Sequence, residues 1–382
     1  MGPLNGYTIV ELAGIGPAPF CATLLADMGA RVIKVDRIQP SGLGIAMEPR
    51  HNVLNRGRRS IAVDLKSPDG VEAVLRLVEQ ADALIEGFRP GVAEKLGLGP
   101  EQCWARNPKL VFGRMTGWGQ DGPWAAAAGH DINYISLSGA LDAVGQENGP
   151  PVPPLNLVGD FGGGGMFLAV GVLAAMMEAR TSGKGQVVDA SMVEGSAYLA
   201  AMFYGMIAAG NWREERGSNV IDGGAHFYGV YETKDGKFVS VGSIEPKFYA
   251  LLVELSGADK EQFGDQMNAK TWAEKRRLLE QIFKTKTRDE WDQVMAKTDV
   301  CYAPVLSFTE AVAHPHNQAR NSYVEIEGVT QPAPSPKFSR TSSAVARPPA
   351  REGEHTNEIL AEWGFSPEKI KQLNASAAVR QD

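Results

Sequence analysis

The sequence predicts an α/β protein in which helices cover a parallel sheet, joined to a smaller α+β domain. Three observations support this class. Short apolar strands alternate with helical segments through the first hundred residues, residues 129–209 are mostly helical and rich in glycine and alanine, and a hairpin signal appears at Asp235-Gly236. A chain of 382 residues corresponds to two or three domains at about 150 residues each.

The first half of the chain supplies the strands of the sheet. Short apolar runs, several of them β-branched, predict strands at residues 7–12, 31–36, 60–65, 83–86, 110–114 and 187–189. A helix is expected over Pro19–Met28, ended by Gly29. A second begins with Ser67 as its cap and Pro68 at its first position, and continues with an apolar stripe at helical spacing: Val71, Val74, Leu75 and Val78.

Two longer apolar runs, Met166–Met177 and Ala197–Ala209, predict buried core helices. Each is shorter than the roughly 18 residues that a membrane span requires. Six methionines between residues 166 and 206 either fill gaps in the core, which is the more frequent role, or form an adaptable apolar surface.

The second half changes character after Gly223-Gly224. Strands over residues 227–233 and 237–242 flank the hairpin turn, and helices are expected at residues 248–255, 273–283 and 290–297. Residues 331–336 and 344–349 are proline-rich connectors, and Thr356 caps a final helix over residues 356–363. The predicted organisation is therefore a large domain over residues 1–200, linker helices over 201–224, a small α+β domain over 225–320, and a connector with a C-terminal helix that returns to the large domain over 321–382.

Charge and cysteine content narrow the function classes. The net charge of −7 argues against general nucleic-acid binding. Three cysteines far apart in the sequence form no C-x-x-C pair, and the N-terminus lacks the pattern of a signal peptide, so we expect a soluble cytoplasmic protein without a membrane anchor. A local basic cluster is best explained as a solvated loop face, unless the fold brings its segments together: Arg56, Arg58 and Arg59, with Lys34, Arg37, Lys66 and Arg89.

Three motifs are better explained by structure than by chemistry. The turn over residues 13–19, with Asp36 after the next strand, resembles a dinucleotide fingerprint, but two prolines remove amide donors that would hold a pyrophosphate. Asp160-Phe161-Gly162 resembles a kinase motif without any other kinase element. The two histidines of residues 314–316 lack a third metal ligand nearby, so no metal site is expected.

His130 is a candidate general base. It precedes a predicted helix, and the positive end of the helix dipole disfavours imidazolium there, which leaves a neutral imidazole near pH 7. Amide groups of the same turn could stabilise an oxyanion. A histidine that only caps the helix explains the same pattern and is slightly favoured on sequence alone.

Two carboxylates complete the candidate set. Asp160 lies in an apolar run before Gly162–Gly165, where burial would raise the pKa of its carboxyl group. An N-cap role explains Asp160 but not the four glycines, which allow a close approach of backbone or ligand. Glu245 precedes Pro246 at a predicted helix start, where it either caps the helix or orients a histidine of the other domain.

Eight blocks in order along the chain resemble the α-methylacyl-CoA racemases of the family III CoA-transferase (CaiB/BaiF) superfamily. The blocks are VELAGIGPAPF, RVIKVDR, IEGFRPGV, GHDINY, PPLNLVGDFGGG, GKGQVVDASMVEG, IDGG and GSIEPKFY. The resemblance runs almost from end to end. It implies a large doubly wound, Rossmann-like domain, a small domain, and an interlocked homodimer whose active sites lie between the subunits.

The resemblance also implies the reaction. (R)- and (S)-2-methylacyl-CoA would be interconverted by 1,1-proton transfer through an enolate, with His130 (supported by Glu245) on one face and Asp160 on the other. Coenzyme A is part of the substrate, and no metal or redox cofactor is implied. Substrate contacts fall on residues that match the family's motifs: Arg37, Val63, Asp64, Leu65, Lys66, Arg89, Gly129, Asp131, Ile132, Asn133 and Tyr134.

Two other functions stay open on the sequence. A CoA-transferase of the same superfamily would use the aspartate at the position of Asp160 as a nucleophile that forms mixed anhydrides, although His130 has no role in that exchange. A non-catalytic acyl-CoA-binding protein would bind the thioester without exchanging its α-proton.

Overall fold

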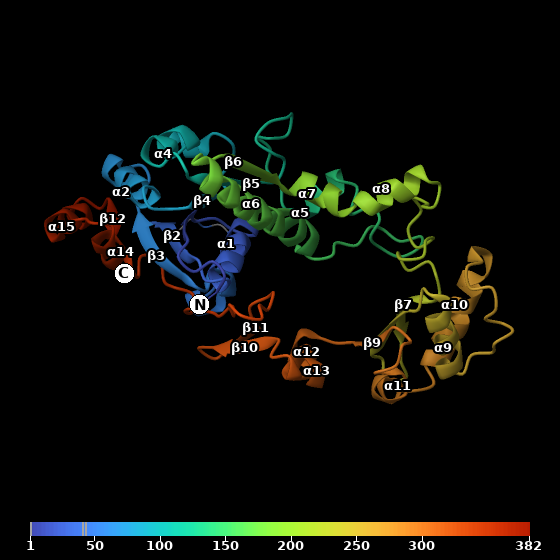
Figure 1. The fold of residues 1–382 in the computed structure, drawn as a ribbon. Helices are drawn as coiled ribbons and strands as arrows, with labels where there is room; N and C mark the ends of the chain where they lie inside the picture. Colours follow the sequence, from blue (N-terminus) through green and yellow to red (C-terminus); the bar gives the residue numbers. More distant parts are fainter. Residues whose placement is uncertain (1, 40–41, 43) are drawn as a thin grey trace. The chain divides into compact units, whose positions relative to one another are not determined.

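The computed structural model describes residues 2–39, 42 and 44–382 (Figure 1). The chain divides into two compact units. Unit 1 contains residues 1–138, 155–199 and 321–382, and unit 2 contains residues 139–154 and 200–320. The segment 139–154 therefore groups with the small unit and not with the large one, as does the segment 201–224, which we expected to be a separate linker.

Unit 1 is built on a seven-stranded sheet in the order β12-β3-β2-β1-β4-β5-β6 (Figure 1). The six strands from β3 to β6 are parallel, and the order reverses beside β1, which confirms the doubly wound class. The short β12 pairs antiparallel with β3. The strands are β1 (Thr8–Leu12), β2 (Arg31–Arg37), β3 (Arg58–Val63), β4 (Ala83–Glu86), β5 (Val111–Thr116), β6 (Val187–Ser191) and β12 (Val379–Arg380).

Helices cover both faces of this sheet because side chains alternate along each buried strand. Val10 points into the core cluster that contains Leu77 and Trp363, whereas its neighbour Ile9 points into the cluster that contains Leu25 and Val172. The helices of unit 1 are α1 (Pro17–Asp27), α2 (Pro68–Val78), α3 (Val92–Lys95), α4 (Pro100–Arg106), α5 (Asp131–Leu137), α6 (Phe167–Ser182), α7 (Met192–Leu199), α14 (Thr356–Glu362) and α15 (Pro367–Ala375), with short 3-10 turns η1 (Pro49–His51) and η2 (Val53–Asn55).

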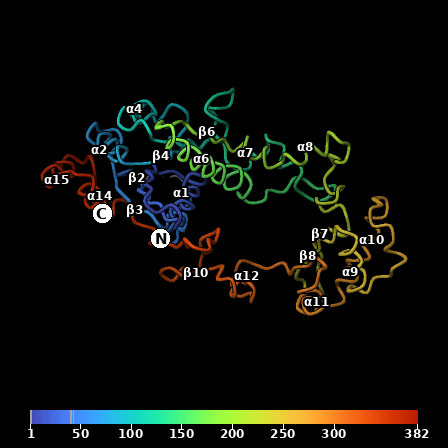
Figure 2. The backbone as a smooth tube through the Cα atoms, viewed as in Figure 1, coloured from blue at the N-terminus to red at the C-terminus, as the bar shows by residue number. Residues whose placement is uncertain are grey.

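The C-terminal segment returns to the sheet, as Figure 2 traces. Helix α14 packs on β3, and two of our expectations for this segment were wrong. Thr356 is not a cap: its hydroxyl accepts the Ala62 amide at 3.1 Å and donates to the Arg380 carbonyl at 2.6 Å, so it fastens α14 between β3 and β12. The proline-rich stretch at 331–336 begins as a strand, because β10 (Tyr323–Ile326) and β11 (Val329–Pro332) form a hairpin around Glu327-Gly328.

Unit 2 carries the predicted hairpin, with β7 (Tyr228–Glu232) and β8 (Phe238–Gly242) joined through Gly236 at positive φ. A third antiparallel strand, β9 (Tyr302–Val305), completes the sheet. Its core contains Tyr231, Phe283 and Trp291. The helices of unit 2 are α8 (Ala201–Ala208), α9 (Pro246–Ser256), α10 (Ala269–Phe283), α11 (Arg288–Met295), α12 (Phe308–Ala313) and α13 (Pro315–Ala319).

The two apolar runs differ from expectation. A π-helix, η3 (Leu157–Met166), continues into α6 and makes one helix of 26 residues, within which an 18-residue stretch has a mean hydropathy of 1.6. Within the described residues, this helix alone is long and apolar enough to span a membrane by length and composition, although Leu168 and Val172 pack against Gly113 of β5. Helix α8 has no buried residue, so the second run is not a core helix.

Candidate active site

The candidate catalytic residues of unit 1 lie beyond the carboxyl ends of the central strands. The loop after β1 contains Gly16, and a Cβ built on that glycine would lie 3.1 Å from Oδ2 of Asp160. Gly16 also has φ near 68°, a conformation that glycine adopts without strain. In open α/β sheets, ligands bind in the crevice outside the carboxyl ends of the strands, where the strand order reverses. Asp160 is therefore at the position where this fold places a ligand.

His130 is the N-cap of α5, with an extended backbone and an exposed side chain. Its amide donates to Oδ1 of Asn133 at 3.0 Å, while the Asn133 amide donates to the His130 carbonyl at 2.8 Å. These two bonds fix the backbone of His130 at the start of the helix. Asn133, which the family resemblance assigns to the substrate wall, thus has a structural role in holding His130.

Asp160 lies inside η3 and does not cap a helix, which excludes the capping alternative. Its Oδ2 accepts a hydrogen bond from Nδ2 of Asn156 at 3.0 Å, and its amide donates to Oδ2 of Asp131 at 2.7 Å. Burial raises the pKa of the Asp160 carboxyl, as expected. The Asn156 bond and the charge of His130 lower this pKa, whereas the charge of Asp131 raises it. His130 and Asp160 thus share one electrostatic environment.

The glycines of η3 serve helix packing. A Cβ on Gly163 would lie 2.6 Å from the Ser196 amide nitrogen, and one on Gly165 would lie 2.7 Å from the Pro17 carbonyl oxygen. The glycines therefore let η3 pack directly on α7 and on the start of α1. This tight packing places Asp160 beside the loop that follows β1. A π-helix is rare and is often found at functional sites.

Tyr134, which the family resemblance assigns to the substrate wall, packs in the core of unit 1. It is buried, its hydroxyl donates to the Gly129 carbonyl, and its ring packs edge-on against Trp118 at 4.7 Å between centroids. Burial raises the pKa of Tyr134, the charge of Asp160 raises it further, and the charge of Arg89 lowers it. Ile132, by contrast, is exposed.

The expected coenzyme A contacts fall into two groups. Arg37, Lys66 and Arg89 are exposed, follow the carboxyl ends of β2, β3 and β4, and take no part in the ion pairs found among the described residues. They can meet an anion. Val63 belongs to the core and Leu65 packs against it, so their side chains contribute to the fold. Asp64 is half-buried and accepts the Lys66 amide at 3.0 Å, which shapes the turn after β3.

The basic cluster of Arg56, Arg58 and Arg59 is neither a solvated face nor a phosphate site. All three side chains are buried in ion pairs: Arg56 with Asp27 at 2.6 Å, Arg58 with Glu11 at 2.5 Å, and Arg59 with Glu358 and Glu362 at 2.6 and 2.7 Å. Since isolated buried charges are costly, each arginine needs its carboxylate partner to remain in the interior. The spacing of these residues in the sequence gave no signal for the partners.

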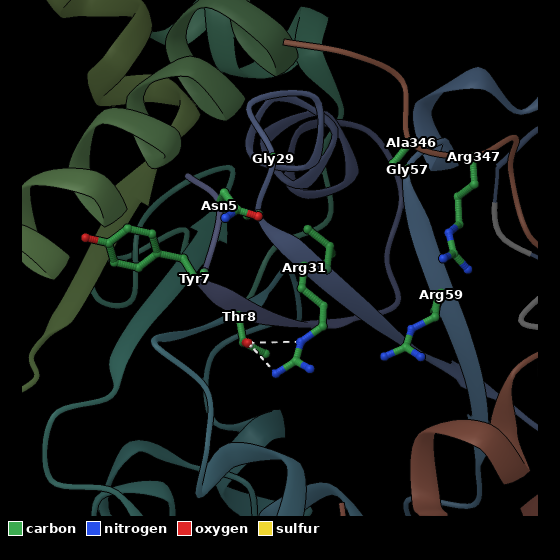
Figure 3. Close-up of a pocket in the computed structure, with 12 residues that line it drawn as sticks. Asn5, Tyr7, Thr8, Gly29, Arg31, Gly57, Arg59, Ala346 and Arg347 are labelled. Carbon is green, nitrogen blue, oxygen red and sulfur yellow. Dashed lines mark hydrogen bonds between the residues drawn. The ribbon is translucent and has the colours of Figure 1, made fainter. Parts of the chain in front are cut away.

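Unit 1 has a cavity of about 520 Å³ at the amino ends of the strands, away from the candidate catalytic residues. Figure 3 shows its lining, which includes Thr8, Arg31 and Arg59 at the amino ends of β1, β2 and β3. Arg31 donates to the Thr8 hydroxyl, and Arg59 is neutralised by two glutamates. None of the predicted site residues lines it. This cavity is therefore not the candidate active site.

Glu245 belongs to unit 2. It is the exposed N-cap of α9, with Pro246 at the first helical position, as expected. The Glu245 side chain makes no hydrogen bond that caps the helix. The pKa of the Cys301 thiol is raised chiefly by burial, and the negative charge of Glu245 raises it further. The simple capping explanation is therefore unsupported, and the carboxylate is available for another partner.

The sequence did not identify Asn156, and it gave Asp131 only as a substrate contact implied by the family resemblance. Asn156 has the direct bond to the Asp160 carboxylate, and the Asp131 side chain holds the Asp160 amide. Asn156 lies four residues before Asp160, a spacing that places side chains on one face of a helix, and this signal could have indicated it. No local pattern indicates that Asp131 contacts a residue 29 positions later.

The fold and this arrangement define a class: the chain belongs to CoA-transferase family III, whose profile matches residues 4–356. The relatives it resembles are more specific. A protein named alpha-methylacyl-CoA racemase from Mus musculus is 46% identical over 382 residues, covering 99% of this chain and 98% of that protein. The Homo sapiens protein of the same name is 44% identical over 384 residues, with the same coverage. A solved CaiB/BaiF family protein from Brucella suis superposes with a TM-score of 0.81 at 27% identity, covering 95% of this chain and 99% of that one. The resemblance seen in the sequence is confirmed.

Proposed function

We propose that this chain is an α-methylacyl-CoA racemase, which interconverts (R)- and (S)-2-methylacyl-CoA thioesters. The observation that carries the proposal is the bond between the two candidate catalytic segments: the residue after His130 accepts the amide of Asp160. Full-length relatives with this activity in their names, at 44–46% identity, support the same conclusion.

The chemistry requires one proton acceptor on each face of the α-carbon. His130, with Glu245 as its support, removes or returns the proton on one face, and Asp160 does so on the other. Burial raises the pKa of Asp160, so its carboxyl group can hold a proton as well as accept one. Because the two groups exchange roles with the direction of reaction, one site serves both enantiomers.

The enolate between the two proton transfers needs stabilisation. The amide groups at the start of α5, next to Asp131, point out of the helix N-terminus, where a negative charge is favoured. A well-placed oxyanion donor contributes roughly 3–4 kcal/mol to such a step. Proton transfer of this kind uses no metal or redox cofactor, and coenzyme A enters as part of the substrate.

Arg37, Lys66 and Arg89 bind the phosphates of coenzyme A in this proposal. This assignment is supported by three properties of these residues: they are exposed, they are positively charged, and they follow the carboxyl ends of three strands of the sheet. The charge of Arg89 lowers the pKa of Tyr134, a residue of the expected thioester wall, and this supports the assignment of Arg89 to the substrate site.

We propose that the enzyme is a homodimer in the cytoplasm and acts in lipid metabolism. Three apolar side chains along η3 and α6 are exposed: Met166 by 46%, Val170 by 63% and Met177 by 73%. An exposed apolar face of this kind supports a surface for the second subunit.

Among the six methionines between residues 166 and 206, Met176 and Met192 are buried, so the set is divided between core and surface. Three free cysteines support a reducing compartment.

The alternative is a CoA-transferase that uses Asp160 as its nucleophile. Anhydride exchange needs no base at the position of His130, so the shared environment of the two residues favours racemisation. The decisive experiment incubates the protein with each enantiomer of a 2-methylacyl-CoA in D2O. Deuterium at the α-carbon supports the racemase. Absence of label, with a hydroxylamine-trapped Asp160 adduct in the presence of a free acid, would establish the transferase instead.

A further inference from the structure

We propose that the carboxylate of Asp131 is a positioning residue, which holds the backbone of Asp160 in register with His130. The inference rests on the proposed function and deepens it. Asp131 follows His130 directly in the chain, and its side chain, not only its amide, connects the two catalytic segments.

The contact is specific in its geometry. Asp131 is 6% exposed, and its Oδ2 lies 2.7 Å from the Asp160 amide nitrogen. A Cβ built on Gly159 would lie only 2.4 Å from the same oxygen, so the bond requires glycine at the position before Asp160. Two features of the chain, an aspartate at the start of α5 and a glycine in η3, are therefore matched to each other.

A structural role alone does not account for this carboxylate. An acid in the first turn of a helix is favoured by the helix dipole, but that effect is available to an exposed side chain as well. Asp131 is buried, and its Oδ1 has no hydrogen-bond partner among the described residues. Burying a carboxylate with an unsatisfied oxygen is costly, and such groups persist where they serve the function of a site.

Asp131 acts on Asp160 in two separable ways. As an acceptor it fixes the amide of Asp160, and as a negative charge it raises the pKa of the Asp160 carboxyl. The groups that oppose this second effect are Asn156, through its hydrogen bond, and His130, through its charge. A substitution that keeps the acceptor but removes the charge therefore separates positioning from electrostatics.

The test compares Asp131→Asn and Asp131→Ala by α-proton exchange in D2O with each enantiomer. Asp131→Ala, which loses the acceptor, should lower kcat at least tenfold with less than threefold change in KM. The loss should be larger for the enantiomer whose exchange His130→Ala spares, since Asp160 serves that one. Asp131→Asn keeps an amide oxygen as acceptor, so it should retain most of the activity, with the acidic limb of its pH profile moved to lower pH.

The control is Glu101→Ala, which removes an exposed acid from the first turn of α4, a helix that contains none of the candidate site residues. A folded Asp131→Ala enzyme with kcat within twofold of this control would overturn the proposal. If Asp131→Ala does not fold, Asp131→Asn decides, because a merely structural carboxylate predicts an unmoved pH profile. If the unsubstituted enzyme exchanges no α-proton, the proposed function fails first and takes this inference with it.

Discussion

At the scale of single residues, the site depends on how neighbours set the properties of one carboxyl group. Asp160 is half-buried, which raises its pKa, and three side chains then adjust it in opposite directions. The sequence predicted the burial effect from the apolar run around Asp160. It could not predict Asp131 or Asn156 as the adjusting groups, because their contacts depend on the path of η3, which the glycine pattern left undefined.

Asn156→Ala tests the hydrogen-bonding side of this adjustment. The amide of Asn156 stabilises the ionised carboxyl, so its loss should raise the pKa of Asp160 further. Asp160 must be ionised to accept a proton, and the acidic limb of the pH–rate profile for that direction should therefore move to higher pH. The control is Asn317→Ala, which removes a hydrogen bond from the side-chain amide of Asn317 to the Ala311 carbonyl in unit 2. It should leave the pH–rate profile unchanged. A limb that stays in place would contradict the assignment.

Glu86 offers a test that concerns stability. It ends β4, accepts the Phe88 amide at 2.6 Å, and burial raises its pKa to about 7 from a model-peptide value of 4.5. The folded protein therefore binds a proton that the unfolded chain releases, and stability falls as pH rises from about 4.5 to 7. In Glu86→Gln this loss of unfolding free energy between low and neutral pH should be smaller by up to roughly 3 kcal/mol, because the side chain no longer ionises.

The measurement is the free energy of unfolding in urea, at pH 5 and at pH 8, for the unsubstituted protein, Glu86→Gln and a control variant. Glu86→Gln should narrow the gap between the two free energies of unfolding, chiefly by gaining stability at pH 8. The exposed Glu101→Gln of α4 should leave the gap as it is. An equal gap in all three proteins would show that Glu86 is ionised normally in the folded state.

At the scale of elements, the sequence predicted the six parallel strands of the large sheet and the β7–β8 hairpin well. It missed strands β9 to β12 and predicted the helices around the site poorly. Strands β1, β2, β4 and β5 follow from short apolar runs, and the β7–β8 hairpin follows from its Asp-Gly turn. Strand β3 begins earlier than expected because the buried ion pairs of Arg58 and Arg59 allow charged residues inside the sheet. No local pattern in the sequence predicts that residues 157–166 form a π-helix and not an α-helix, since the wider turns of η3 depend on its packing against α1 and α7.

Gly163→Ala tests whether that packing positions the site. The added methyl group would lie 2.6 Å from the Ser196 amide nitrogen, so η3 and α7 must move apart. We expect a loss of about 1–3 kcal/mol in stability. Exchange should fall more steeply for the enantiomer served by Asp160 than for the other.

Gly205→Ala in α8 is the matched control, because nothing lies within 4 Å of its added Cβ. This substitution should be neutral, or should stabilise the helix by up to about 1 kcal/mol. Equal exchange rates in Gly163→Ala and Gly205→Ala would show that close packing of η3 does not govern the position of Asp160.

At the scale of the whole molecule, the arrangement of charge explains how an acidic protein can bind an anionic substrate. The net charge is −7, yet exposed cations follow β2, β3 and β4 at the carboxyl edge of the sheet. The sequence predicted these individual cations. It did not separate them from the neighbouring arginines that form buried ion pairs, because only the fold shows which guanidinium groups have carboxylate partners.

Arg89→Ala tests this arrangement. Phosphate contacts are made equally in the ground state and the transition state, so their loss should raise KM for the acyl-CoA about tenfold with little change in kcat. Added salt should reduce the difference between the two enzymes, since exposed charges are screened. Lys109→Ala removes an exposed cation just before β5, at the opposite edge, and should change neither parameter. A lower kcat at unchanged KM would place Arg89 in the chemistry instead.

The most direct measurement of the two-sided proton transfer is α-proton exchange in D2O by His130→Ala and Asp160→Ala, each with pure (R)- and pure (S)-2-methylacyl-CoA. The account predicts complementary behaviour: each variant loses exchange chiefly with one enantiomer, and the sensitive enantiomer differs between the two variants. If both folded variants lose exchange equally with both enantiomers, or are both sensitive to the same one, His130 and Asp160 do not act on opposite faces of the substrate.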